Sequence, residues 1–167
     1  MRTIVLTGMS GSGKSTVGKF LSDNLNAKYF DIDEQIVLKE NKSINEIFAQ
    51  NGEQYFRKLE TQIIKELFED KNLIISLGGG AFENEQTRNL LLQNAVVIYL
   101  ETSAEIIFER LKNTTDRPML NNSMNLERIE MLLNSRKNNY ELAHFTILTD
   151  NKNVQEIGSE IIKNVQA

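Results

Sequence analysis

Short apolar runs alternate with longer amphipathic stretches along this 167-residue chain. The runs are rich in Ile, Val and Leu, and most are continuously apolar rather than interrupted by polar residues. Such runs are typical of strands in a parallel sheet that helices cover on both faces. The predicted strands are residues 3–7, 27–31, 72–77, 95–101 and 145–150.

The amphipathic stretches between these strands predict helices. Several begin with a Ser, Thr or Asn that is followed three residues later by Glu, which is the spacing of a capping box. These pairs are Ser43 with Glu46, Thr102 with Glu105, and Asn153 with Glu156. The glycine of Asn51-Gly52 predicts a helix end. The predicted helices are residues 14–25, 43–51, 53–69, 105–111, 126–142 and a last helix from 153.

This alternation predicts an α/β fold, a three-layer sandwich with a five-stranded parallel sheet and helices on both faces. The length suits a single domain over residues 1–167. One segment, residues 112–125, differs because it is polar, rich in Asn and Thr, and holds the only proline of the chain. We predict that this segment is a mobile lid within the domain.

The composition and net charge of the chain disfavour several kinds of binding partner. The chain has a net charge of −4 and no cysteine. The charge disfavours nucleic acid as a partner, and without cysteine no disulfide or thiolate metal site can form. No apolar run reaches the roughly 18 residues of a membrane span, and the N-terminal run is too short for a signal peptide. We therefore expect a cytoplasmic protein without a membrane partner, and a monomer.

The loop after the first strand carries the clearest chemical signal. GMSGSGKST, residues 8–16, matches the P-loop pattern G-x-x-x-x-G-K-[ST] at every fixed position. A predicted strand precedes it and a predicted helix follows, so backbone N–H groups and a helix N-terminus would converge on a phosphate. In a P-loop the lysine, here Lys14, reaches the β- and γ-phosphates, and the hydroxyl of Ser15 binds Mg²⁺. The pattern predicts a site for a nucleoside triphosphate with magnesium.

The P-loop does not identify the acceptor, because GTPases, ATPase motors and small-molecule kinases share it. A GTPase needs an Asn-Lys-x-Asp motif, and the Asn-Lys pairs at Asn41 and Asn151 both lack the Asp. ATPase motors usually need a longer chain and an arginine from a neighbouring subunit. This chain carries Arg117 in its own predicted lid. These features favour a small-molecule kinase whose lid closes over the substrates.

Polar groups and glycines gather where the second and third predicted strands end. Asp31 and Asp33 follow one strand, and Gly78, Gly79 and Gly80 follow the other. Ligands of open α/β sheets bind beyond the carboxyl ends of strands, so one carboxylate would hold a metal's water shell and the other would orient an acceptor hydroxyl. The alternative for either aspartate is a helix N-cap. Three glycines let a ligand approach the backbone, whereas a plain turn needs only one or two.

Two arginines have spacings that place them against apolar helix faces. Arg136 lies in register with the apolar face of 126–142, where a charge is costly unless it is paired. Its partner is either a structural carboxylate, with Glu60 as the candidate, or an anionic ligand. Arg57 leaves the same choice, and two arginines converging on one carboxylate would bind it in a bidentate manner. The single histidine, His144, has no obvious partner and is expected at the surface.

Taken in order, these motifs resemble those of the shikimate kinase family over nearly the whole chain. The P-loop is widely shared, but the ordered combination is specific. The stretches that carry the resemblance are GMSGSGKST, FDID, FRKLE, SLGGG, DRPML and RKNNY. Members of this family phosphorylate the 3-hydroxyl of shikimate in aromatic amino acid biosynthesis. The resemblance implies this activity, with Mg²⁺ as the metal and with ATP and shikimate as small-molecule substrates.

The resemblance also implies roles for the matching residues. The catalytic residues would be Lys14, Asp33 as the base, and Arg117, which would stabilise charge on the transferring phosphoryl group. The ATP-binding residues would be Gly11, Ser12, Gly13, Lys14, Ser15, Thr16, Arg110, Arg117 and Asn153. The acceptor-binding residues would be Asp33, Arg57, Gly78, Gly79, Gly80 and Arg136, within or near an acceptor-binding segment over residues 32–62. Ser15 would bind the metal directly and Asp31 through water.

Two positions depart from the family pattern. The predicted lid reads Arg-Pro-Met-Leu where the family usually has Arg-Pro-Leu-Leu, which conserves volume. Many members carry a proline beside adenine near the start of the final helix, and here Asn153 or a neighbour takes that place.

Two alternatives stay open at this point. The first is a kinase for another polyol acid, such as gluconate, and the second is a non-catalytic nucleotide-binding module. Arg57, Arg136 and the three glycines favour a carboxylated ring as the acceptor. Asp33 and Arg117 argue against a module that only binds.

Overall fold

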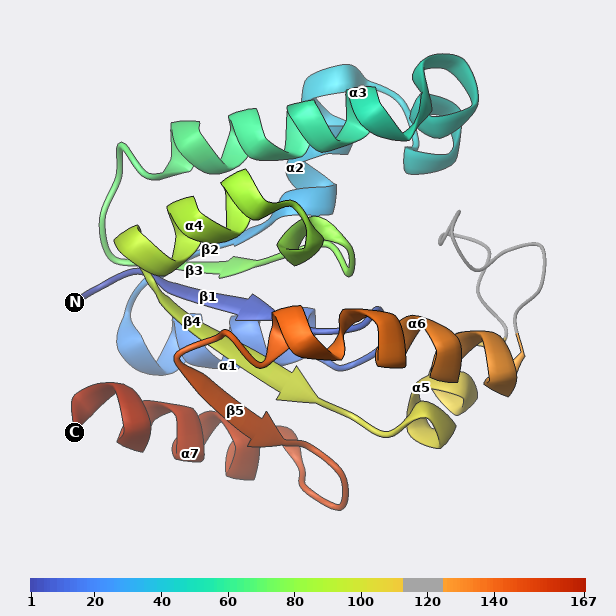
Figure 1. Ribbon diagram of the computed structural model, residues 1–167. Helices are drawn as coiled ribbons and strands as arrows, with labels where there is room; N and C mark the ends of the chain where they lie inside the picture. Colours follow the sequence, from blue (N-terminus) through green and yellow to red (C-terminus); the bar gives the residue numbers. More distant parts are fainter. Residues whose placement is uncertain (113–124) are drawn as a thin grey trace.

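The computed structural model describes residues 1–112 and 125–167. Within these residues, five strands form one parallel sheet in the order β2-β3-β1-β4-β5 (Figure 1). The strands are β1 (Ile4–Thr7), β2 (Lys28–Asp31), β3 (Leu73–Ser76), β4 (Val96–Glu101) and β5 (Phe145–Leu148). β1 lies between β3 and β4, and β2 lies beside β3. The carboxyl ends of β1, β2 and β3 therefore meet at one edge of the sheet.

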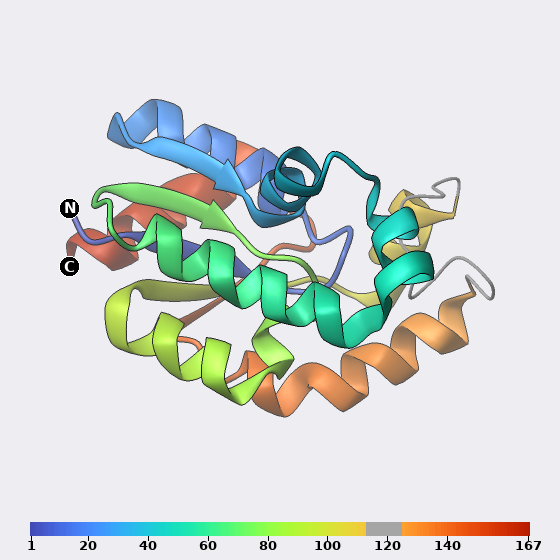
Figure 2. The same cartoon turned by 90° about the horizontal axis from the view of Figure 1, so that it is seen from above.

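Helices cover both faces of this sheet, as predicted. The helices are α1 (Lys14–Leu25), α2 (Ile32–Glu40), α3 (Ile44–Leu67), α4 (Glu85–Asn94), α5 (Ala104–Leu111), α6 (Leu126–Tyr140) and α7 (Val154–Gln166), with a 3₁₀ turn η1 (Ala81–Glu83). Val5 and Ile75 face a core shared with α3 and α4, whereas Ile4 and Ile74 face a core shared with α1 and α7. Figure 2 looks onto the first face, which α3, α4 and α6 cover. The three-layer α/β sandwich is confirmed.

Local signals in the sequence account for most helix ends. Ser43 and Asn153 both form complete capping boxes with the glutamates three residues later. Gly52 has a φ of 81° and interrupts α3, where a helix end was predicted. The box predicted at Thr102 is wrong, because Ser103 is the N-cap of α5 and makes no side-chain bond. The Thr102 hydroxyl instead hydrogen-bonds the Thr149 hydroxyl across the sheet.

Two helices, α2 and α4, have no counterpart among the predicted elements. α2 begins immediately after β2, with the Asp31 side chain accepting a hydrogen bond from the N–H of Glu34. It buries only Ile32 and Ile36, so its apolar stripe is too short to be recognised from spacing. Residues 113–124 of the predicted lid lie outside the described residues. Among the residues described, no helix combines the length and apolar character needed to cross a membrane.

Candidate active site

The P-loop joins β1 to α1 at the carboxyl edge of the sheet. Gly13, the N-cap of α1, has a φ of 91°, a conformation that favours glycine. The buried ammonium of Lys14 lies across the loop and donates to the carbonyls of Gly8 at 2.8 Å and Met9 at 2.9 Å. Within residues 1–112 and 125–167, the buried hydroxyl of Ser12 makes no hydrogen bond. Donors and a positive charge are thus concentrated in a loop suited to an anion.

Two side chains that carry oxygen atoms, Ser15 and Asp31, contact each other beside this loop. The Ser15 hydroxyl donates to Oδ2 of Asp31 at 2.8 Å. Oδ1 of Asp31 also accepts from the backbone of Glu34 at 3.2 Å, so this aspartate is both an N-cap and the partner of the P-loop serine. A hydroxyl and a carboxylate are hard oxygen donors of the kind that Mg²⁺ prefers. The two side chains fit a magnesium ion that completes its coordination with phosphate and water.

A cavity of about 570 Å³ connects the P-loop with residues from four other parts of the chain. Arg110 and Asn153 border it on one side, and Nη1 of Arg110 donates to the carbonyl of Gly11 at 2.8 Å. Asp31, Asp33, Gly78 and Gly79 border it on another side. The lining also includes every P-loop residue that was predicted to bind ATP: Gly11, Ser12, Gly13, Lys14, Ser15 and Thr16.

The two predicted arginines meet at the loop formed by Gly78, Gly79 and Gly80. Arg136, from α6, donates to the carbonyl of Gly79 at 3.2 Å. Arg57, from α3, lies so close to Gly80 that a Cβ there would be 2.4 Å from Nη2 of the guanidinium. A Cβ on Gly79 would be 3.4 Å from Nη1 of Arg136 and 3.0 Å from Oγ of Ser10, a P-loop residue. The arginines therefore lie on the same side of the sheet as the phosphate loop.

Glu60 is a buried carboxyl group of this region and was one of the two candidate partners for Arg136. Its Oε1 pairs with Nη1 of Arg57 at 2.9 Å, one helical turn away, whereas Arg136 contacts Gly79 and the sulfur of Met9. Burial raises the pKa of Glu60 to about 7, and the nearby Arg57 only partly opposes that shift. Its Oε2 has no hydrogen-bond partner in the part of the chain that the structure describes. Of the two alternatives for Arg136, the salt bridge with Glu60 is therefore not found among the described residues, and the anionic ligand stays a prediction.

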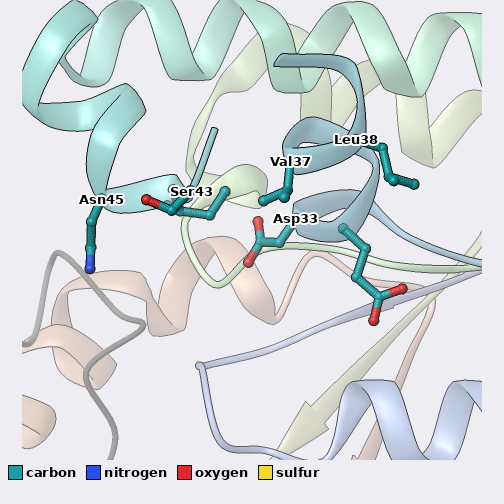
Figure 3. Close-up of a pocket in the computed structure, with 7 residues that line it drawn as sticks. Asp33, Val37, Leu38, Ser43 and Asn45 are labelled. Atoms are coloured by element: carbon teal, nitrogen blue, oxygen red, sulfur yellow. The ribbon is translucent and has the colours of Figure 1, made fainter. Parts of the chain in front are cut away.

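Asp33 lies where two cavities meet. It borders the P-loop cavity and also a second cavity of about 540 Å³ between α2 and the start of α3. Figure 3 shows its carboxylate among the residues that line the second cavity, with Val37 on one side and Ser43 on the other. A Cβ on Gly78 would be 2.9 Å from Oδ1 of Asp33. This carboxylate is placed to contact a group that approaches the phosphate loop from the acceptor side.

The remaining predicted residues are Arg117 and His144, and Arg117 lies outside the described residues. His144 is exposed, as expected, but it has a partner, because its Nδ1 accepts from the backbone N–H of Val97 at 3.0 Å. Sequence reasoning gave no role to Met9 or to Tyr140, whose hydroxyl donates to the Gly79 carbonyl. Tyr140 follows Arg136 by four residues, which places both side chains on one helix face, so this spacing could have indicated a role for Tyr140.

Comparisons with known proteins agree with this geometry. The protein-family model described as shikimate kinase matches residues 10–166 of this chain. Shikimate kinase from Sulfurihydrogenibium sp. is 42% identical over 99% of both chains, and that of Geobacter metallireducens is 39% identical over 96% of this chain and 90% of its own. The structure of shikimate kinase from Acinetobacter baumannii in complex with shikimate superposes with a TM-score of 0.95 at 33% identity, covering 99% of this chain and 93% of that one. This chain belongs to the shikimate kinase family.

Proposed function

We propose that this protein transfers the γ-phosphoryl group of ATP to the 3-hydroxyl of shikimate, giving shikimate 3-phosphate and ADP. Family membership supports the overall reaction. The assignment of the site depends on the short distance between the phosphate loop and the arginines. Gly79 lies beside both the P-loop Ser10 and Arg136. Donor phosphates and an acid acceptor would therefore meet in one cleft.

On the donor side, the P-loop backbone and Lys14 would bind the phosphates, and Arg110 and Asn153 would border the adenine. Ser15 and Asp31 would hold Mg²⁺, which when bound neutralises charge on the phosphates. Arg117, in the predicted lid, would add positive charge at the transferring group. Water must be excluded from such a site, or ATP is hydrolysed.

On the acceptor side, Arg57 and Arg136 would bind the shikimate carboxylate, with Gly79 and Gly80 lining the ring. Asp33 would accept the proton of the 3-hydroxyl as that oxygen attacks the γ-phosphorus. The position of Asp33 between the two cavities supports this role. Most of the rate enhancement would come from alignment and charge stabilisation, because phosphoryl transfer needs little covalent chemistry from the protein.

A single assay tests this function. The protein is mixed with ATP and Mg²⁺, and ADP release is measured with shikimate, with gluconate and without an acceptor. We expect ADP only with shikimate, in a 1:1 ratio with shikimate 3-phosphate detected by mass spectrometry. Turnover with gluconate would identify a kinase for another polyol acid, and nucleotide binding without turnover would identify a binding module. We further expect the enzyme to act as a cytoplasmic monomer, which size-exclusion chromatography with light scattering tests for the oligomeric state.

A further inference from the structure

The hydroxyl of Tyr29 lies beside the proposed magnesium ligands and has no role in the proposed function. Tyr29 lies on β2, two residues before Asp31, and is half-buried. Its hydroxyl lies 3.4 Å from Oδ2 of Asp31, the same oxygen that accepts from Ser15. The tyrosine therefore contacts the carboxylate that would hold the metal.

The Asp31 carboxylate is held by three donors from different parts of the chain. Oδ1 accepts from the backbone N–H of Glu34, and Oδ2 accepts from Ser15 and Tyr29. The first bond fixes the carboxylate to the start of α2, and the second ties it to α1. Only the tyrosine bond comes from a side chain on the same strand, so it restrains rotation of the carboxylate relative to the sheet.

The tyrosine ring is itself held tightly in place. It packs on Gly18 of α1, where a Cβ would be 2.4 Å from Cε2 of the ring and 2.9 Å from the hydroxyl oxygen of Ser76. No side chain larger than hydrogen fits there without displacing the ring or the helix. Ser76, at the end of β3, in turn donates to the carbonyl of Lys14. A rigid ring places its hydroxyl at low entropic cost, which is what a supporting residue needs.

We propose that Tyr29 is a positioning residue that orients the Asp31 carboxylate for Mg²⁺ bound with the nucleotide. This inference rests on the proposed function of Ser15 and Asp31 as the magnesium side of the site. Tyr29 does not touch substrate or metal; it acts through Asp31. Its removal should weaken the binding of the metal rather than that of the nucleotide alone or of shikimate.

The test is the variant Tyr29→Phe, which deletes the hydroxyl and keeps the ring. ADP binding is measured by isothermal titration calorimetry without metal and at a series of Mg²⁺ concentrations. We expect the half-saturating Mg²⁺ concentration to rise about fivefold, the effect of losing one ordinary hydrogen bond. Metal-free ADP affinity and shikimate KM should stay at wild-type values, and Tm should fall by no more than about 2–4 °C, the effect of one lost hydrogen bond. The matched control is Tyr55→Phe, which deletes a hydroxyl that donates to Glu40, away from the P-loop.

A second variant separates this inference from the function on which it rests. Asp31→Asn should raise the Mg²⁺ requirement, and adding Tyr29→Phe to it should cause little further change, because the carboxylate that the tyrosine orients is gone. If Asp31→Asn raises the requirement and Tyr29→Phe does not, the positioning role is overturned and the metal assignment stands. If neither variant changes the Mg²⁺ dependence, the magnesium assignment itself is overturned. Equal losses of metal-free and metal-bound ADP affinity in Tyr29→Phe would indicate a merely structural role and also overturn the inference.

Discussion

The donor and acceptor sides of the cleft are built in different ways. The donor side comes mainly from one contiguous loop, whose lysine is held by that loop's own carbonyls. The acceptor side brings together Asp33 from α2, Arg57 and Glu60 from α3, and Arg136 from α6. In the proposed site, phosphate binding would therefore depend on local backbone geometry, whereas acceptor recognition would depend on tertiary packing around buried charges. Substitutions on the two sides should separate cleanly into effects on turnover, on acceptor affinity and on stability.

The largest effect is expected from the donor side. Lys14→Met should lower kcat by roughly 10²–10³-fold, because it removes a preorganised positive charge from the transferring phosphates. The KM for shikimate should change less, since the acceptor carboxylate is assigned to Arg57 and Arg136. Steady-state kinetics with each substrate varied measures both constants. Lys19→Met, an exposed lysine on the same helix, is the control and should keep wild-type turnover. A Lys14 variant with normal kcat would contradict the donor-side assignment.

The next largest effect is expected from the acceptor side. Arg136→Ala should raise the KM for shikimate by about 100-fold, because a charge-assisted hydrogen-bonded contact contributes up to about 3 kcal/mol. The KM for ATP should stay near the wild-type value. Arg136→Lys should recover only part of the loss, since lysine keeps the charge but lacks the planar fork.

The control for this prediction is the neighbouring residue on α6. Lys137 is exposed and pairs with Glu141, so Lys137→Ala should leave both KM values unchanged. If Arg136→Ala raised the KM for ATP as much as that for shikimate, the two sides of the cleft would not be separable. The clamp assignment would then be wrong.

A smaller, pH-dependent effect is expected at Glu60. Its pKa is raised from 4.5 to about 7, chiefly by burial, so the folded protein holds a proton here that the unfolded chain releases between these values. The free energy of unfolding should therefore fall as pH rises from 4.5 to 7 and level off above that, by up to about 3 kcal/mol. Glu60→Gln should lack this contribution. Urea unfolding at a series of pH values measures the difference.

An exposed glutamate supplies the comparison for this experiment. Glu69→Gln changes the same charge at the surface and should keep the wild-type dependence on pH. If the wild-type and Glu60→Gln curves run parallel from pH 4.5 to 7, Glu60 is ionised throughout in the folded protein. The attraction of Arg57 would then at least match the cost of burial.

The same contrast explains what could be predicted from the sequence. The P-loop residues and the capping boxes at Ser43 and Asn153 are contiguous patterns whose geometry is local, and both boxes are confirmed. The capping box at Thr102 failed because a tertiary contact with Thr149 takes the hydroxyl away from the helix. Local patterns hold where no distant residue competes for the same atom.

The acceptor side shows where sequence reasoning stops. Spacing placed Arg57 and Arg136 on inward faces, but it could not decide which of them pairs with Glu60, because that choice depends on the distance between α3 and α6. Arg136 and Met9 are far apart in the sequence, so no sequence pattern indicates their contact. Tyr29 likewise looked like an ordinary strand residue, and only its contact with Asp31 distinguishes it.

The smallest predicted effect tests the proposed adenine edge of the donor side. Asn153 caps α7 through Oδ1, which accepts from the N–H of Glu156 at 2.9 Å, and it also borders the P-loop cavity. Asn153→Ala should cost about 1 kcal/mol of stability through the lost cap, which lowers Tm by roughly 2–4 °C in a chain of this size. Thermal unfolding measures this change, and steady-state kinetics measures the KM for ATP.

Asp at this position separates the two roles, because it caps a helix as well as Asn does but has no amide hydrogens to donate. We expect Asn153→Asp to restore Tm while the KM for ATP stays raised about threefold to fivefold in both variants, the effect of one lost hydrogen bond to the base. If Asp restores both quantities, Asn153 acts only as a cap. The adenine contact would then have to come from the neighbouring Lys152 or Val154, which border the same cavity.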